Sequence, residues 1–375
     1  MLYMEYLISI VLSFIVAFSA TPIAKKIAFR IGAVDVPKDD RRMHKKPIAL
    51  FGGAAIAAGF IISILYNVIS TSDIFIPGRP LWGKELWGLM AGIAIIVTMG
   101  VLDDIKHLRA RIKLFLQIAA AVAVVLISGT TIDVVTNPFS PDGFSTLSPF
   151  ISYPITVLWI VGITNAVNLI DGLDGLAAGV SSISSLSLFF VSILSVGLTP
   201  DPYTSVVTAA LAGAALGFLP FNFNPAKIFM GETGSAFLGF TLGVVSIQGM
   251  LKSYTTISIA IPLLVLGLPL FDTTFAILRR VISGKPVMTA DRGHLHHKLI
   301  DMGLSQKQSV VVMYIASAAL GLCAIVLANK GVLSAIILLI SVSVFVIGGA
   351  RYMNEVGIGE AEEEQAQEVK KLENP

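Results

Sequence analysis

The chain has 375 residues, of which 55% are apolar and only 13% are charged. About a quarter of the residues of a soluble globular domain are charged, so this composition argues against a soluble globular protein. The 26 Lys and Arg and 24 Asp and Glu give a net charge of +2, which provides no basic field and disfavours nucleic-acid binding.

Apolar runs bounded by charged residues, Gly, Pro or polar clusters predict an all-α polytopic membrane protein with eleven transmembrane helices. A β-barrel does not fit, because the runs are continuous rather than alternating. Residues 1–350 are expected to form one membrane domain, followed by an acidic, disordered tail at 351–375. The predicted spans are 3–24, 50–70, 86–102, 112–129, 150–167, 175–196, 203–220, 235–251, 257–278, 310–328 and 332–348.

The basic residues predict the orientation of these spans. With the N-terminus outside and the C-terminus inside, 22 of the 26 Lys and Arg residues fall on the inner side, as the positive-inside rule requires. The first run is expected to be a retained span, because no basic residue precedes it. All five histidines fall on the inner side as well, so we expect the chemistry at the cytoplasmic face. The single cysteine, Cys323, excludes an intramolecular disulfide and a cysteine-based metal site.

The third predicted span ends in two adjacent carboxylates, Asp103 and Asp104. Carboxylates beside hydrocarbon are costly unless they are neutralised. Mg²⁺ is one way to neutralise them, since it binds one or two carboxylates together with substrate phosphates. The alternative is a pair of helix-end acids that face water and the nearby Lys106 and Arg109.

The fifth predicted span leads into a polar segment with a helical spacing. Asn165, Asn168 and Asp171 are three residues apart, so in a helix they share one face, which Asp174 continues. The loop that follows has no basic residue, so its acids lack a local counter-ion. We therefore interpret this segment as part of a functional site.

A further polar segment, which begins near Asn222, precedes the eighth predicted span. The run Gly-Glu-Thr-Gly-Ser at 231–235 starts an apolar helix, and the free N–H groups of such a start can hold an anion such as phosphate. Glu232 is alternatively an ordinary first-turn acid that interacts with the helix dipole.

The last third of the chain carries an intramembrane acid and a histidine cluster. Asp272 lies in the ninth predicted span and is either a functional group or a buried acid bonded to a neighbouring helix. The cluster of His294, His296 and His297 suggests binding of a metal or a phosphate, with zinc disfavoured. The guanidinium of Arg292 has paired N–H donors whose geometry suits a diphosphate.

The inner-face carboxylates, amides and histidines together predict a site for a phosphorylated substrate with Mg²⁺, which a lipid phosphate can enter from the membrane. Phosphoryl transfer fits, because a metal that bridges two phosphates neutralises developing charge while a carboxylate activates the nucleophile. The same segments resemble the polyprenyl-phosphate N-acetylhexosamine-1-phosphate transferase family along nearly the whole chain. The similar segments are 35–53, 103–104, 165–176, 229–235, 269–272 and 294–297.

The resemblance implies transfer of N-acetylglucosamine 1-phosphate from UDP-N-acetylglucosamine to undecaprenyl phosphate, with release of UMP. The implied cofactor is Mg²⁺, with Mn²⁺ as an alternative, and the implied location is the inner membrane of a bacterium. The reaction would be the first membrane step of a cell-envelope polymer such as teichoic acid or O-antigen. Membrane lipids are further partners, and a homodimer is compatible with this reading.

The resemblance also assigns roles to residues. Asp103 and Asp104 resemble the pair that binds metal and activates the nucleophile, and Asp171 and Asp174 resemble the catalytic loop. Glu232 stands where the family usually has an Asp metal ligand, and its side chain is one methylene longer. The implied substrate-binding residues are His44, Lys113, Asn165, Asn168, Asn222, Arg292, His294, His296 and His297.

Two alternatives remain open. The branch of the family that uses UDP-N-acetylmuramoyl-pentapeptide usually has three consecutive histidines, so the interrupted cluster at 294–297 favours N-acetylglucosamine. A cation-coupled secondary transporter is the alternative from a different class. It is disfavoured because transporters usually place such acids near the midplane, often between internal repeats.

Overall fold

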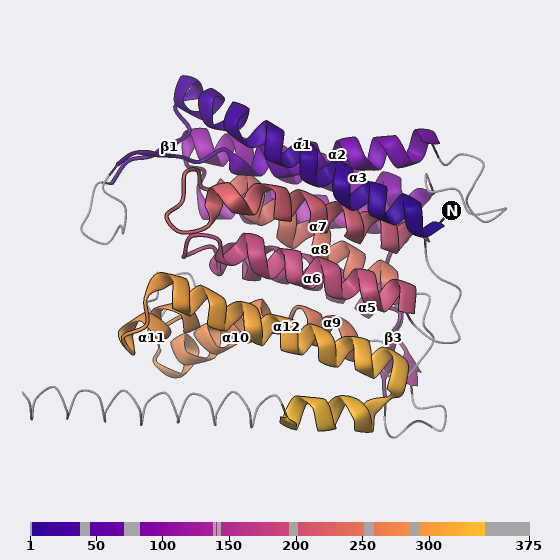
Figure 1. Ribbon diagram of the computed structural model, residues 1–375. Coiled ribbons are helices and arrows are strands. Elements are labelled where there is room, and N and C mark those ends of the chain that lie inside the picture. Colours follow the sequence, from indigo (N-terminus) through magenta and orange to yellow (C-terminus); the bar gives the residue numbers. More distant parts are fainter. Residues whose placement is uncertain are drawn as a thin grey trace, which may run out of the picture. The chain divides into compact units, whose positions relative to one another are not determined.

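The computed structural model describes residues 2–37, 46–70, 83–137, 140, 144–194, 202–250, 259–284 and 293–341. These residues are mostly helical, which confirms the predicted all-α class (Figure 1). The chain divides into two compact units, residues 1–329 and residues 330–375. The elements discussed below belong to the first unit, except that the helix Gln306–Lys330 ends at the first residue of the second unit. Of the second unit, only residues 330–341 are described, and they include the short helix Val332–Ser341. The predicted tail at 351–375 lies outside the described residues.

The first unit contains helices joined mainly by short connections, with two small antiparallel strand pairs, β1 with β2 and β3 with β4. The helices are α1 (Leu2–Ile31), α2 (Gly52–Ser70), α3 (Lys84–Lys106), α4 (Ala110–Ser128), α5 (Pro149–Leu169), α6 (Leu176–Leu194), α7 (Pro202–Asn222), α8 (Gly231–Met250), α9 (Ala260–Val265), α10 (Gly267–Ile282), α11 (Leu295–Asp301) and α12 (Gln306–Lys330). The strands are β1 (Val34–Asp35), β2 (Ile48–Ala49), β3 (Val134–Thr136) and β4 (Phe144–Thr146).

Eight helices within the described ranges are long and apolar enough to cross a membrane, namely α1 to α7 and α12. They correspond to eight of the eleven predicted spans, so the chain is a multi-pass membrane protein. The predicted span 235–251 corresponds to α8, which has 20 residues. The span 332–348 is described only as far as residue 341. The total of eleven and the orientation of the termini stay predictions.

The prediction of one continuous helix over 257–278 is wrong. Within the described part of this range the chain forms two helices, α9 and α10, with Leu266 between them. Pro269 explains the break, because a proline ring clashes with the carbonyl four residues earlier and its nitrogen cannot donate a hydrogen bond. Proline is tolerated in the first turn of a helix, where its nitrogen needs no intrahelical acceptor. The new helix, α10, starts at Gly267, which places Pro269 in its first turn.

The central element of the first unit is α8. It contacts α2, α3, α5, α6 and α7, while α1 packs on α2 and α7. A helix that is apolar on all sides is buried rather than amphipathic, and α8 fits this rule, since Phe237 and Phe240 are both fully buried. The surrounding helices therefore fix the position of the first turn of α8.

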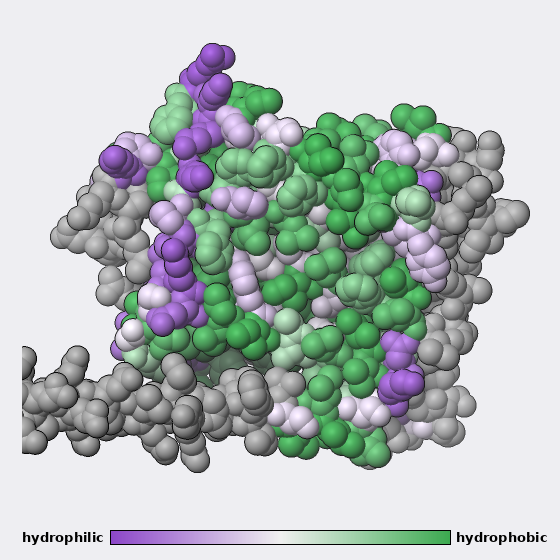
Figure 2. All heavy atoms as spheres, viewed as in Figure 1, coloured by the Kyte–Doolittle hydropathy of each residue, from purple (hydrophilic) through white to green (hydrophobic). Residues whose placement is uncertain are grey.

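Hydrogen bonds link helix ends that lie far apart in the sequence. The ends of α3 and α5 bond to the start of α8, and the start of α6 bonds to the end of α7. Figure 2 shows hydrophobic side chains over the middle of the visible face, with hydrophilic ones gathered at the end where Figure 1 labels β1 and α11. The predicted site residues collect at this end of the helices.

Candidate active site

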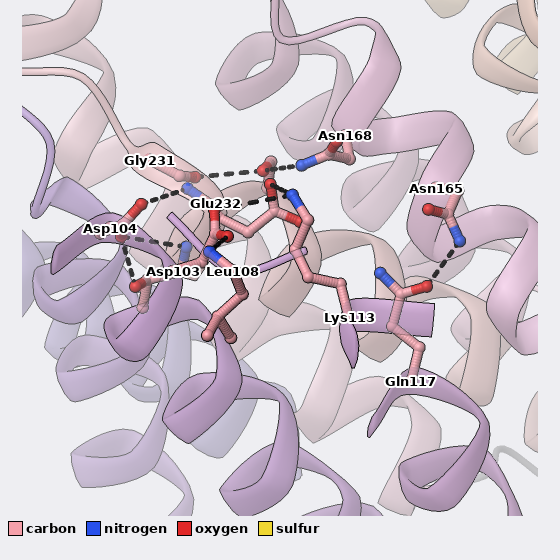
Figure 3. Close-up of polar contacts among 11 residues, drawn as sticks. Asp103, Asp104, Leu108, Lys113, Gln117, Asn165, Asn168, Gly231 and Glu232 are labelled. Carbon is pink, nitrogen blue, oxygen red and sulfur yellow. Dashed lines mark hydrogen bonds and ion pairs between the residues drawn. The ribbon is translucent and has the colours of Figure 1, made fainter. Parts of the chain in front are cut away.

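The end of α3 lies against the first turn of α8. Gly100 allows this approach, because a Cβ atom at this position would overlap the backbone of Thr233. One turn later, the Asp104 carboxylate accepts hydrogen bonds from the Glu232 N–H at 2.7 Å and from the Thr233 N–H and hydroxyl at 3.2 and 2.6 Å (Figure 3). Asp104 is only 4% exposed. A carboxylate in this position satisfies free N–H groups and interacts favourably with the helix dipole, so Asp104 caps α8 from a neighbouring helix.

The anion at the start of α8 is therefore a side chain of the protein itself. The sequence suggested that free N–H groups in this turn could hold a phosphate, but those of Glu232 and Thr233 bond to Asp104. Both carboxylate oxygens of Asp104 are engaged, Oδ1 by Glu232 and Oδ2 by Thr233. In this arrangement Asp104 positions the turn that carries Glu232.

We expect Asp104→Asn to lower both the thermal midpoint and the turnover. The new amide group would face an N–H donor of α8, and a buried donor left without an acceptor costs about 1–3 kcal/mol. Thr233→Val removes only one of the three hydrogen bonds, so its midpoint should fall less, and Thr233→Ser is the control that keeps the hydroxyl. Thermal unfolding in detergent measures all three variants. If Asp104→Asn has the same thermal midpoint as the unaltered protein, Asp104 does not stabilise the start of α8.

Lys113, near the start of α4, lies between two carboxylates. Its Nζ is 3.1 Å from Glu232 Oε2 and 3.6 Å from Asp103 Oδ2 (Figure 3). A connection of three residues between α3 and α4 brings Lys113 back to this point. In it His107 has φ 51°, and the Leu108 N–H donates to Asp103 Oδ1 at 2.8 Å. All three charged side chains are partly buried, which reduces the screening of their interactions by water.

The two asparagines of α5 share one face, as their spacing predicts. The Asn168 amide donates to the Ser235 hydroxyl of α8 at 2.8 Å, and the Asn165 amide donates to Gln117 Oε1 of α4 at 2.7 Å (Figure 3). Sequence reasoning missed Gln117. The signal was there, because Gln117 follows Lys113 by four residues and so lies on the same face of α4.

The turn after α5 is held against the connection between α7 and α8. Asp174 Oδ2 accepts hydrogen bonds from the Asn224 amide at 3.0 Å and from the Ala226 N–H at 2.9 Å. The buried Asn222 accepts from the Gly175 N–H at 3.1 Å. Asp174 and Asn222 therefore order the backbone beside Asp171, while their assigned roles with the substrate stay predictions.

Asp171 differs from the other acids of the site. Within the described residues its carboxylate has no hydrogen bond and no ion pair. Burial raises the pKa of this carboxyl from 3.8 to about 7, and the nearby negative charges of Glu232, Asp104 and Asp174 act in the same direction. A carboxyl group that titrates near neutral pH and has no partner is suited to hold a cation or to accept a proton.

The histidine cluster contacts the same turn through His296. His294 accepts or donates a hydrogen bond through Nδ1 with Asp272 Oδ2 at 2.9 Å, so Asp272 is a buried acid bonded to a neighbouring element. The ring of His296 lies over Gly172, and a Cβ atom on that glycine would be 2.6 Å from His296 Nε2. His297 packs on His296 with ring centroids 4.3 Å apart. The fold thus brings His296 against Gly172, the residue after Asp171.

Two predicted site residues, His44 and Arg292, lie outside the described residues. Among the residues that are described, no group of three or more His, Cys, Asp or Glu side chains forms a ready metal cage. Mg²⁺ does not require such a cage, because it commonly uses one or two carboxylates with waters and substrate phosphates. The carboxylates of Asp103 and Glu232, which both lie beside Lys113, fit such a shared site.

Comparisons with known proteins decide the family. The profile of glycosyl transferase family 4 matches residues 86–250, which cover α3 to α8. The "Probable undecaprenyl-phosphate N-acetylglucosaminyl 1-phosphate transferase" of Bacillus subtilis (strain 168) is 41% identical over 327 residues, which are 86% of this chain and 86% of that protein. The chain belongs to the polyprenyl-phosphate N-acetylhexosamine-1-phosphate transferase family.

Two further relatives are less similar to the chain. The "Decaprenyl-phosphate N-acetylglucosaminephosphotransferase" of Mycolicibacterium smegmatis is 31% identical over 80% of this chain and 77% of that protein. The "Undecaprenyl-phosphate alpha-N-acetylglucosaminyl 1-phosphate transferase" of Salmonella typhi is 29% identical over 80% of this chain and 77% of that protein. The region of the chain that the family profile matches includes Asp103, Asp171 and Glu232, but it ends before the histidine cluster at 294–297.

Proposed function

We propose that this protein transfers N-acetylglucosamine 1-phosphate from UDP-N-acetylglucosamine to undecaprenyl phosphate and releases UMP. The observation that carries the proposal is the meeting of Asp103, Glu232 and Lys113 at one end of membrane-spanning helices. Asp171, whose carboxyl has no hydrogen bond or ion pair within the described ranges, lies in the field of Glu232. The names of the relatives at 41% and 29% identity support the transferred group, N-acetylglucosamine 1-phosphate, and the acceptor.

In the proposed reaction, an oxygen of the lipid phosphate attacks the phosphorus that bears the sugar. A new P–O bond forms, the bond to UMP breaks, and UMP leaves with the bridging oxygen. Lys113 is placed to offset negative charge on the diphosphate as it is rearranged. Asp171 is the candidate to accept a proton from the lipid phosphate, because a carboxyl that titrates near neutral pH is matched to this task.

Mg²⁺ is the proposed cofactor, with Glu232 and Asp103 as the residues that would hold it. When bound, it would supply positive charge to the phosphate oxygens. The longer side chain of Glu232 suits this arrangement, because it reaches Lys113 while its backbone N–H stays bonded to Asp104.

We further propose that the site faces the cytoplasm of a bacterial cell and that the enzyme starts a cell-envelope polymer. The orientation is supported by the 22 of 26 Lys and Arg residues that fall on the side of the site when the spans are counted from an outer N-terminus. A nucleotide-sugar donor is a cytoplasmic compound, so this orientation and the proposed chemistry agree.

Donor competition tests the proposal. Purified protein in lipid nanodiscs with undecaprenyl phosphate and Mg²⁺ is offered labelled UDP-N-acetylglucosamine, UDP-N-acetylgalactosamine and UDP-N-acetylmuramoyl-pentapeptide. We expect UMP release with N-acetylglucosamine as the preferred donor, and loss of turnover when EDTA removes the metal. Preference for the muramoyl-pentapeptide donor would replace the proposed substrate. If an ion gradient drives solute flux and no UMP is released, the protein is a transporter and the proposed enzymatic function is wrong.

A further inference from the structure

The start of α11 is held by a carboxylate from α10, as the start of α8 is held by Asp104. Asp272 Oδ1 accepts the Leu295 N–H at 2.7 Å, and Asp272 Oδ2 lies 2.9 Å from Nδ1 of His294, the residue before the helix. Both Asp272 and His294 are buried. One carboxylate therefore has two separate contacts, one with the backbone of α11 and one with a histidine ring.

A second histidine, His296, lies between His294 and the turn of the site at Gly172. His294 and His296 are stacked, with centroids 5.7 Å apart and an interplanar angle of 10°. His296 is 2% exposed, and its Nε2 faces the backbone at Gly172. Its Nδ1 has no hydrogen-bond partner among the residues that the structure describes. Burial lowers the pKa of His296 to about 4, so this ring is neutral at physiological pH. Since the described residues offer Nδ1 of this ring no hydrogen bond, the position of the ring depends on packing against its neighbours.

We propose that Asp272 is a positioning residue for the transfer reaction, which orients His294 and, through the stacked ring of His296, fixes the wall of the site beside Asp171. This inference rests on the proposed function. A carboxylate bonded to one ring nitrogen of a histidine sets both the tautomer and the orientation of the ring, and so decides what the other nitrogen offers. Asp272 does not touch the reacting groups in this role and acts through His294.

The two contacts of Asp272 can be separated by mutation. Asp272→Asn and His294→Gln each break the pair between carboxylate and ring. Leu295→Pro is the matched control, because it removes the N–H that Asp272 accepts and keeps the pair. Proline is favoured at the first position of a helix, and His294 already has φ −62° and ψ 151°, which suit a residue before proline. The side chain of Leu295 is 39% exposed, so little packing is lost.

We expect Asp272→Asn and His294→Gln each to lower kcat about tenfold or more, with a smaller change in KM for the donor. The double variant should be no slower than the slower single variant, because both changes break one interaction. Leu295→Pro should stay within about threefold of the unaltered protein. An unchanged kcat for Asp272→Asn, multiplied effects in the double variant, or a loss in Leu295→Pro equal to that in Asp272→Asn would each overturn the inference.

A second measurement does not depend on turnover. The ¹⁵N chemical shifts of labelled histidine report which ring nitrogen carries the proton, and the spectrum of His294→Gln identifies the signals of His294. We expect Asp272→Asn to change the Nδ1 signal of His294, and Leu295→Pro to leave it unchanged. If the unaltered protein releases no UMP, the proposed function fails while this comparison still tests the pairing. An unchanged Nδ1 signal in Asp272→Asn overturns the inference.

Discussion

Asp171→Asn is expected to reduce the rate of UMP release by a factor of about 10²–10⁴, the usual contribution of a positioned acid or base. The neighbouring acids are already committed, Asp104 to the start of α8 and Asp174 to the connection that leads to it. The carboxylate of Asp171 has no such commitment within the described residues, so it is the one available to the substrate or to a cation. Release of UMP under saturating donor and lipid measures the effect.

The same substitution is expected to stabilise the metal-free protein at alkaline pH. In the folded protein the pKa of Asp171 is raised from 3.8 to about 7, so between these values the folded state keeps a proton that the unfolded state has lost. The free energy of unfolding therefore falls as the pH rises through this window. This decrease in the free energy of unfolding is of the order of a few kcal/mol, and Asp171→Asn abolishes it because asparagine does not titrate. The thermal midpoint of Asp171→Asn should therefore exceed that of the unaltered protein at pH 8 but not at pH 4.

Asp301→Asn is the control for Asp171→Asn. Asp301 is an exposed carboxylate at the end of α11, so its loss changes the net charge of the protein by the same amount without changing the turn after α5. Its turnover should match that of the unaltered protein. A rate for Asp171→Asn above about a tenth of the unaltered rate would remove Asp171 from the proposed reaction.

Gly100→Ala is expected to lower the thermal midpoint and to reduce turnover more than tenfold. The added Cβ atom would overlap the backbone of Thr233, and backbone inside a packed bundle cannot move aside as a flexible side chain can. Overpacking of this kind costs about 1–3 kcal/mol or more. A shift of the first turn of α8 would also displace Glu232 from Lys113, and misplacement of a reacting group by about 1 Å can cost about a hundredfold in rate.

Gly162→Ala in α5 is the matched control. A Cβ atom at Gly162 meets no atom within 4 Å, so the substitution adds the better helix former without a clash. We expect an unchanged or slightly raised thermal midpoint and unchanged turnover. Equal losses in Gly100→Ala and Gly162→Ala would show that the contact between α3 and α8 has no special importance.

The parts of the site that the sequence predicted are those governed by local rules. The spacing of Asn165 and Asn168 placed both amides on one face of α5, because side chains three residues apart align on a helix. The first-turn position of Glu232 followed from the run of Gly, Thr and Ser at the start of α8. In each case the information lies within one or two helical turns.

The parts that the sequence could not predict depend on contacts between distant segments. The first turn of α8 was a candidate phosphate site, but Asp104, more than 120 residues earlier, bonds to it. The break at Leu266 was missed because an apolar run resembles one span until the effect of Pro269 on the preceding turn is considered. The contact of His296 with the turn at Gly172 has no local signal.

The sequence by itself determined that this is a multi-pass helical membrane protein of a known transferase family, with carboxylates, amides and histidines beside its apolar runs. Apolar length and residue type were enough for this, because a membrane demands long apolar helices and makes unpaired charges costly. Only the tertiary structure decided which contacts each charged group makes. It bonded Asp104 and Asp272 to helix starts and placed Lys113 between two acids, and among the described residues it gave the Asp171 carboxyl no partner. Pairing depends on which helix ends the packing around α8 brings together.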